Sequence, residues 1–123
     1  MVSLEENGIS VLEVLPEYAE GLHLIEQMKE LDIIFVFDRS EGFDLKVHPR
    51  GDESYPKRGV FSTRSPRRPN PLGITRVRLI AREGNRLRVR GLDAFLSTPI
   101  VDIKAVPGKN FDWRRTGMVR NGA

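Results

Sequence analysis

The stretch from Gly59 to Ile74 combines a stiff backbone with side chains that bind anions. It reads Gly-Val-Phe-Ser-Thr-Arg-Ser-Pro-Arg-Arg-Pro-Asn-Pro-Leu-Gly-Ile. Each proline fixes its own φ, lacks a backbone donor and pushes the preceding residue towards an extended conformation. Its arginines, Arg64, Arg67 and Arg68, carry planar donor forks that suit a carboxylate or a phosphate. We therefore interpret the stretch as a preformed binding loop, with a rigid surface turn of solvated arginines as the alternative.

Basic charge is concentrated around the same stretch. The 123-residue chain has 20 Lys and Arg against 17 Asp and Glu, a net charge of +3. Between Lys57 and Arg90 lie 11 of these basic residues and a single acid, Glu83. Such a local excess favours an anionic partner, with nucleic acid as the first candidate. The solvated outer face of a sheet is the alternative explanation.

Composition removes several classes of function. The chain has no cysteine and only two histidines, His23 and His48, so we expect no disulfide framework, no thiolate chemistry and no metal site. No apolar run has membrane-spanning length and no signal-peptide pattern opens the chain, so we expect a cytoplasmic protein without a membrane partner. The length predicts a single domain over residues 1–123, with 107–123 as a C-terminal tail.

Apolar spacing in the first half predicts strands around one helix. Residues 9–15 are β-branched and apolar, which indicates a strand, and Pro16 suits the first turn of a helix. Within that helix four side chains recur at helical spacing and are expected to pack in the core: Tyr18, Leu22, Ile25 and Met28. The continuous apolar run 33–37 predicts a buried strand. Residues 43–57 are rich in Gly, Asp, Pro and Lys, which predicts an irregular excursion.

Alternation in the second half predicts an antiparallel hairpin. Residues 75–79 and 86–91 place apolar side chains on one face and arginines on the other, around a turn at 82–85. A further strand is expected at 100–106. We predict that the arginine face contacts an RNA backbone, with an exposed sheet wall as the alternative. The predicted RNA-binding residues are Arg67, Arg68, Arg86 and Arg88.

The proline- and arginine-rich stretch resembles the signature of the TrmO, or TsaA-like, family. Gly91-Leu92-Asp93 with residues 98–104 is similar to that family's second motif, and residues 16–22 and 33–37 resemble its upstream segments. Family members are S-adenosylmethionine-dependent tRNA methyltransferases built on a small β-barrel. The resemblance implies a mainly β (α+β) fold, a small barrel of antiparallel strands with one helix near the N-terminus. It also implies a short single-domain form that lacks the family's usual N-terminal segment.

The same resemblance places the cofactor, S-adenosylmethionine, on particular positions. These are Asp38, Arg39, Arg64, Ile74, Gly91, Leu92 and Asp93. Relatives often have histidine-glutamine where this chain has Asp38-Arg39. The implied acceptor is the exocyclic amine of a modified adenosine in tRNA, and either Asp93 or Asp102 is a candidate for taking up the released proton, although no catalytic residue is assigned. The family also implies a homodimer.

Two other classes of function stay open at this stage. One is a non-catalytic β-barrel module that binds RNA through the arginine hairpin. The other is a cofactor-binding protein without a nucleic-acid partner. A Rossmann-type methyltransferase is not supported, because no Gly-rich dinucleotide fingerprint follows a strand, and the sequence has no P-loop.

Overall fold

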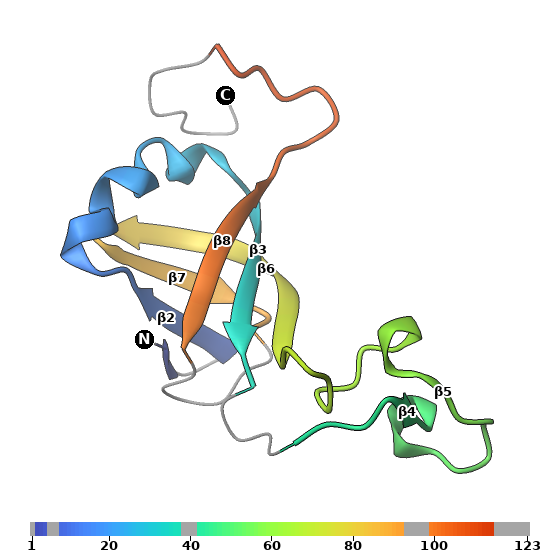
Figure 1. Cartoon of the computed structure of the whole chain (residues 1–123). Coiled ribbons are helices and arrows are strands. Elements are labelled where there is room, and N and C mark those ends of the chain that lie inside the picture. Colours follow the sequence, from blue (N-terminus) through green and yellow to red (C-terminus); the bar gives the residue numbers. More distant parts are fainter. Residues whose placement is uncertain (1, 5–7, 38–41, 93–98, 115–123) are drawn as a thin grey trace.

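Six antiparallel strands form one twisted sheet in the order β1-β2-β7-β6-β3-β8 (Figure 1). The structure, a computed structural model, describes residues 2–4, 8–37, 42–92 and 99–114. The strands are β1 (Val2–Leu4), β2 (Ile9–Glu13), β3 (Glu30–Val36), β6 (Leu72–Glu83), β7 (Arg86–Arg90) and β8 (Ile100–Val106). A separate two-stranded ladder pairs β4 (Lys46–Val47) with β5 (Arg58–Gly59). The predicted strands are thus confirmed, and the excursion after β3 is irregular apart from this short ladder and single turns of 3-10 helix at Pro49–Gly51 and Val60–Ser62.

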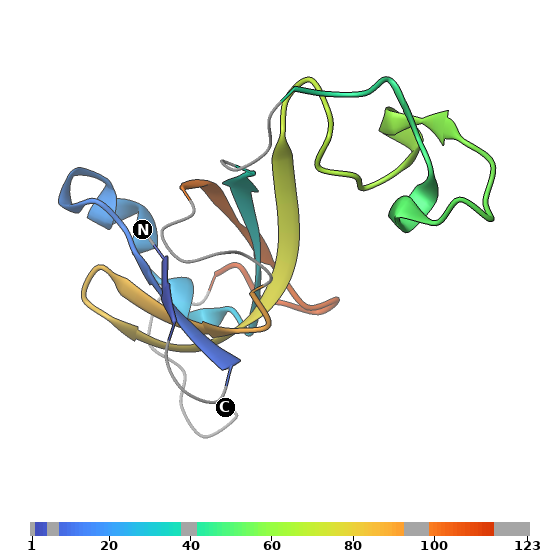
Figure 2. The ribbon, with the colours of Figure 1, turned by 90° about the horizontal axis from the view of Figure 1, so that it is seen from below.

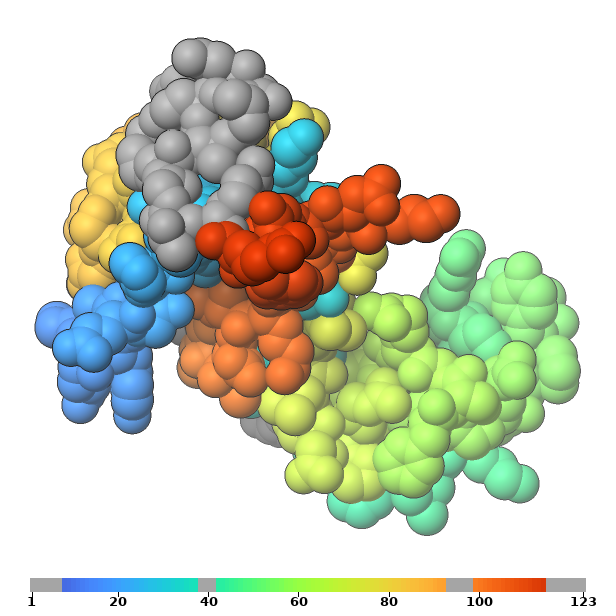
Figure 3. Space-filling model, turned by 90° about the horizontal axis from the view of Figure 1, so that it is seen from above, coloured from blue at the N-terminus to red at the C-terminus, as the bar shows by residue number. Residues whose placement is uncertain are grey.

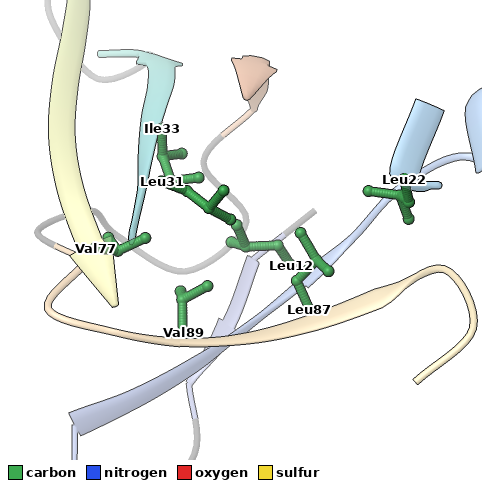
Figure 4. Close-up of a cluster of buried hydrophobic side chains, with 7 residues drawn as sticks. All are labelled: Leu12, Leu22, Leu31, Ile33, Val77, Leu87 and Val89. Carbon is green, nitrogen blue, oxygen red and sulfur yellow. The ribbon is translucent and has the colours of Figure 1, made fainter. Parts of the chain in front are cut away.

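One face of the sheet carries the core. Its buried cluster consists of Leu12, Leu22, Leu31, Ile33, Val77, Leu87 and Val89 (Figure 4). Along β7 the arginines are exposed and the residues between them are buried, so the predicted alternation is confirmed. The β6–β7 hairpin is also confirmed, with a register shift between Leu79 and Ala81 that marks a bulge.

The sheet stays open, so the predicted β-barrel is not confirmed. Among the described residues β1 and β8 lie at the two edges and no pairing joins them. A groove of about 650 Å³ separates β8 from the end of β2 and the helical segment that follows it, with Leu15, Tyr18 and Val101 among its walls. Helical residues close the core on this side, because Leu22 is buried and Ile25 and Met28 pack against the cluster. Side chains rather than a strand pairing therefore cover the core here.

The predicted N-terminal helix is present as two 3-10 segments, η2 (Pro16–Leu22) and η3 (Ile25–Gln27). Their backbone bonds span three residues, as between the Tyr18 amide and the Leu15 carbonyl at 2.9 Å. Leu24 has a left-handed φ of 65°, and this turn of the backbone separates η2 from η3. Core packing of Met28 is confirmed, whereas the same expectation for Tyr18 is wrong, since its side chain is 65% exposed.

A long excursion, residues 42–71, leaves the sheet after β3 and returns as β6. We call it the arm. Figure 2 shows the arm extending to one side of the sheet, and in the space-filling view it forms a separate lobe (Figure 3). Hydrogen bonds within the arm hold its shape: the Val60 amide donates to the Leu45 carbonyl at 2.9 Å, and Val60 is its buried apolar residue. The arm therefore carries the proline- and arginine-rich stretch away from the core.

The junction of arm and sheet depends on a close approach at Gly73. This glycine pairs with Phe35 across β3 and β6. A Cβ atom at Gly73 would lie 2.6 Å from the Phe35 ring and 2.8 Å from the Phe37 ring. The two rings pack edge to face with centroids 5.2 Å apart. Both aromatic positions therefore require a residue without a side chain at 73.

We expect Gly73→Ala to destabilise the protein by about 1–3 kcal/mol, because the new methyl group forces both rings to move. Urea unfolding followed by circular dichroism measures the change. Gly108→Ala is the control, since nothing lies within 4 Å of a Cβ atom at that position. Equal stability of the two variants would contradict the steric argument.

An ion pair on the outer face joins β3 to β6. Arg76 donates from Nε to Asp32 Oδ1 at 3.0 Å and from Nη2 to Oδ2 at 3.2 Å. This hydrogen bonding lowers the pKa of Asp32 and raises that of Arg76. Because the carboxyl pKa is lower in the folded state, the pair stabilises the protein above the ordinary aspartate range. That stability is lost as the pH falls through the folded pKa.

We expect wild type to be more stable than Asp32→Asn at pH 7, and the difference to shrink as the pH drops below about 4. Urea midpoints measured from pH 7 to pH 3 test this. Asp112→Asn serves as the control, because its carboxylate bonds Arg114 within a local turn. A difference between wild type and Asp32→Asn that stays constant with pH would contradict the linkage.

Candidate functional site

A cavity of about 460 Å³ lies where the arm meets the sheet. Its walls are Phe35, Phe37, Thr63, Arg64, Arg68, Leu72, Gly73, Ile74 and Thr75. The end of β3 supplies the aromatic side, the start of β6 supplies the floor, and the arm supplies the arginines. The cavity volume lies within the range of small-molecule sites, about 300–1,000 Å³.

Two residues predicted to bind a cofactor meet in this cavity. Arg64 Nη2 donates a hydrogen bond to the Ile74 carbonyl oxygen at 3.1 Å. Both residues line the cavity and both are exposed. A guanidinium has five N–H donors, so this contact orients the fork while donors remain for an anionic group.

Arg68 braces the loop that carries Arg64. Its guanidinium donates to three backbone carbonyls of that loop, Val60 at 3.4 Å, Thr63 at 3.2 Å and Ser65 at 2.8 Å. The Thr63 hydroxyl donates to the Val60 carbonyl at 2.8 Å and accepts the Ser65 amide at 3.2 Å. These contacts fix the loop before a ligand enters. The assignment of Arg68 to RNA stays a prediction, and the contacts shown are structural.

Arg67 closes the base of the arm. Its Nε donates to Asp44 Oδ2 at 2.7 Å, and the Asp44 amide donates back to the Arg67 carbonyl at 3.1 Å. Farther out, Ser54 donates to Asp52 from its hydroxyl at 2.6 Å and its amide at 2.9 Å, which lowers the pKa of that carboxyl. The RNA contact predicted for Arg67 stays a prediction.

The remaining predicted cofactor residues divide into two groups. Gly91 and Leu92 follow β7: a Cβ atom on Gly91, whose φ is 95°, would lie 3.9 Å from the Arg76 carbonyl, and Leu92 packs against the core. Neither lines the cavity. Asp38, Arg39 and Asp93 lie outside the described residues. Asp102, the other candidate proton acceptor, lines the groove beside β8 rather than this cavity.

The arginine face of the hairpin is largely neutralised by carboxylates. Arg86 Nη2 lies 3.3 Å from Glu13 Oε2 and Arg88 Nη1 lies 3.5 Å from Glu83 Oε1. Both predicted RNA-binding residues of the hairpin are therefore engaged in ion pairs. Their RNA contact remains a prediction. The sequence alone did not reveal the partner of Arg86, because Glu13 lies 73 residues away along the chain.

Sequence reasoning missed the aromatic wall of the cavity. Phe35 and Phe37 were expected only as parts of a buried strand, and Gly73 only as the end of a motif. A glycine paired with a buried phenylalanine indicates a close approach, but that pairing is known only once the β3–β6 register is known.

The described residues include neither a cluster of metal ligands nor a membrane-spanning helix. Among them no group of three or more His, Cys, Asp or Glu side chains is arranged to hold a metal ion. No helix in the described part of the chain is long and apolar enough to cross a membrane.

Similar proteins are known for most of the chain. Residues 2–110 match the tRNA-methyltransferase O N-terminal domain. An S-adenosyl-L-methionine-binding protein of Archaeoglobus fulgidus is 42% identical over 98 residues, which cover 80% of this chain and 69% of that protein. The human tRNA (adenine(37)-N6)-methyltransferase is 40% identical over 83 residues, which cover 65% of this chain and 18% of the human protein.

The fold has a solved relative as well. TrmO from Pseudomonas aeruginosa is 30% identical and gives a TM-score of 0.64 over 90% of this chain. The match covers 48% of the Pseudomonas chain, so the protein spans about half of that relative's length. Since the family match extends over residues 2–110 of 123, the chain belongs to the tRNA-methyltransferase O N-terminal domain family.

Proposed function

We propose that this protein is an S-adenosylmethionine-dependent methyltransferase that holds its cofactor in the cavity between the arm and the sheet. We further propose that the acceptor is the exocyclic amine of a modified adenosine in tRNA, or a close relative of it. One observation carries the proposal: Arg64 is hydrogen-bonded to the Ile74 carbonyl inside a cavity that Phe35 and Phe37 also line. The names of the Archaeoglobus and human relatives support the cofactor and acceptor classes.

The cavity residues fit the chemical parts of this cofactor. Arg64 is exposed and oriented by the Ile74 carbonyl, so its free donors suit the methionine carboxylate. Phe37, which is half-buried, presents aromatic surface suited to the adenine ring, and Phe35, only 3% exposed, packs edge to face against it. Arg68 and Thr63 hold the loop in shape, so little ordering is needed when a ligand binds.

Catalysis in this proposal comes mainly from positioning. When bound, S-adenosylmethionine would supply an electrophilic methyl group on its sulfonium, with the neutral thioether as the leaving group. The chain's own contribution is to fix the cofactor through Arg64 and to shield one side with the phenylalanine rings. Such a reaction asks for few catalytic side chains.

A cofactor-binding protein without catalysis is the second candidate. None of the described residues that line the cavity is Asp, Glu or His, so this part of the wall offers no general base. Asp93 and Asp102 both stay candidates for the proton acceptor in the enzyme reading, and a methyl-transfer assay separates the two candidate functions.

We expect wild type to bind S-adenosylmethionine in calorimetric titration without RNA, and Arg64→Ala to weaken binding at least tenfold by removing the carboxylate partner. Arg50→Ala is the matched control, since Arg50 is an exposed arginine of the arm outside the cavity. Transfer of a labelled methyl group to bulk tRNA should follow the same order.

Undiminished binding by Arg64→Ala would overturn the assignment of the cavity. Cofactor binding without methyl transfer to any tRNA would instead favour the non-catalytic candidate.

We also propose that the protein forms a homodimer through the arm. Four large apolar side chains of the arm are at least half exposed: Phe43 at 52%, Leu45 at 63%, Tyr55 at 51% and Phe61 at 75%. The arm extends to one side of the sheet (Figure 2). A second copy that buries these side chains would remove a surface that monomers rarely expose.

Sedimentation velocity tests the dimer. We expect wild type to sediment as a dimer and Leu45→Ser/Phe61→Ser as a monomer, because the double change removes the apolar contact. Val101→Ser, an exposed apolar position on β8, should leave the dimer intact. A monomeric wild type at all concentrations would contradict the proposal.

A further inference from the structure

Two arginines face each other across the β6–β7 hairpin. Arg78 on β6 is the direct partner of Arg90 on β7 in the antiparallel register. Both are exposed on the outer face of the sheet. Side chains that are direct partners in an antiparallel pair have Cβ atoms about 4.5–5.5 Å apart, so the two guanidiniums can reach a common ligand.

The cross-strand neighbours of this pair make no ion pair with it. On the far side of Arg90, strand β2 presents Ile9. On the far side of Arg78, strand β3 presents Glu30 as its direct partner, and the charge of Glu30 also acts on Arg76. Within the described part of the chain no carboxylate lies within the 4.0 Å of an ion pair from Arg78 or Arg90.

The other arginines of the hairpin differ in this respect. Arg76 binds Asp32, Arg82 binds Glu26, Arg86 binds Glu13 and Arg88 binds Glu83. Ligands of these arginines must compete with a carboxylate already in place. Arg78 and Arg90 keep their donors for a ligand from outside the described chain.

Like charges in direct cross-strand partnership destabilise a sheet. Arg78 and Arg90 thus form an unfavourable like-charge pair in a hairpin whose other arginines have carboxylate partners. An anion placed between two such forks removes the repulsion and gains charge-assisted hydrogen bonds from both.

We propose that Arg78 and Arg90 form a phosphate-binding site that receives the backbone of the RNA acceptor. This inference rests on the proposed function and specifies where its nucleic-acid substrate lies. Phosphodiester oxygens match guanidinium forks, and the outer face of the sheet is open to a long ligand. The proposed site places the RNA contact of the hairpin on Arg78 and Arg90, whereas the sequence-based prediction names Arg86 and Arg88.

Fluorescence anisotropy with labelled bulk tRNA at several salt concentrations tests this site on the full chain. Arg78→Gln/Arg90→Gln should lose about tenfold or more in affinity at moderate salt, and its salt slope should fall by about 1.5. Its melting temperature should stay equal or rise, because the like-charge pair is removed. S-adenosylmethionine binding, measured by calorimetry, should not change.

Arg86→Gln/Arg88→Gln is the matched comparison, since it removes the same charge from the same hairpin. We expect its tRNA affinity to stay within about threefold of wild type, because the carboxylate beside each of these arginines repels phosphate and offsets the attraction of the guanidinium. Equal losses in the two double variants would overturn the inference in favour of unspecific attraction, and a larger loss in Arg86→Gln/Arg88→Gln would overturn it in favour of the sequence-based assignment.

Two further outcomes are separable. If Arg78→Gln/Arg90→Gln turns the dimer into a monomer in sedimentation, the pair contacts a second copy and the phosphate site is wrong. If wild type binds S-adenosylmethionine but no tRNA, the RNA acceptor of the proposed function fails, and the phosphate site fails with it. Unchanged affinity of Arg78→Gln/Arg90→Gln beside a tRNA-binding wild type defeats this inference alone.

Discussion

The cavity depends on the contact between two phenylalanine rings and the bare backbone of Gly73. Because no Cβ atom stands at position 73, the rings of Phe35 and Phe37 lie against the start of β6. The same strand start presents the Ile74 carbonyl that orients Arg64. The aromatic wall, the floor and the arginine of the candidate site are therefore set by one steric condition at the arm–sheet junction. A side chain at residue 73 would alter all three together.

Stability and binding are divided between different parts of the chain. The sheet buries a compact cluster on one face, and the 3-10 segments cover it on the side where no strands pair among the residues that the structure describes. The arm has little apolar core of its own and keeps its shape through Arg68, Thr63 and the Asp44–Arg67 pair. Prolines supply the remaining stiffness by limiting φ. Because the sheet supplies the buried core, the arm can expose arginines and large apolar side chains on its surface.

Arginine is used here in three distinct ways. Arg68 binds backbone carbonyls and shapes a loop, Arg76 bonds Asp32 across two strands, and Arg64 is oriented towards a cavity. Composition treats these residues alike, yet their surroundings give each a different role. The positive potential of the basic block between Lys57 and Arg90 is therefore weaker than its formal charge suggests. Several of its arginines have carboxylate partners from other parts of the chain.

The sequence by itself determined the strands, the hairpin and the stiff arginine-bearing loop, since these depend on local periodicity and on proline and glycine geometry. It also indicated Arg64 and Ile74 together, through the motif that contains both. Only the tertiary structure decided that the sheet stays open, that Tyr18 is exposed and that Phe35 and Phe37 wall the cavity. It likewise decided which arginines are neutralised, because ion pairs such as Arg86–Glu13 join residues far apart in the chain. Strand order and register bring such residues together, and the spacing of residues along the sequence predicts neither of them.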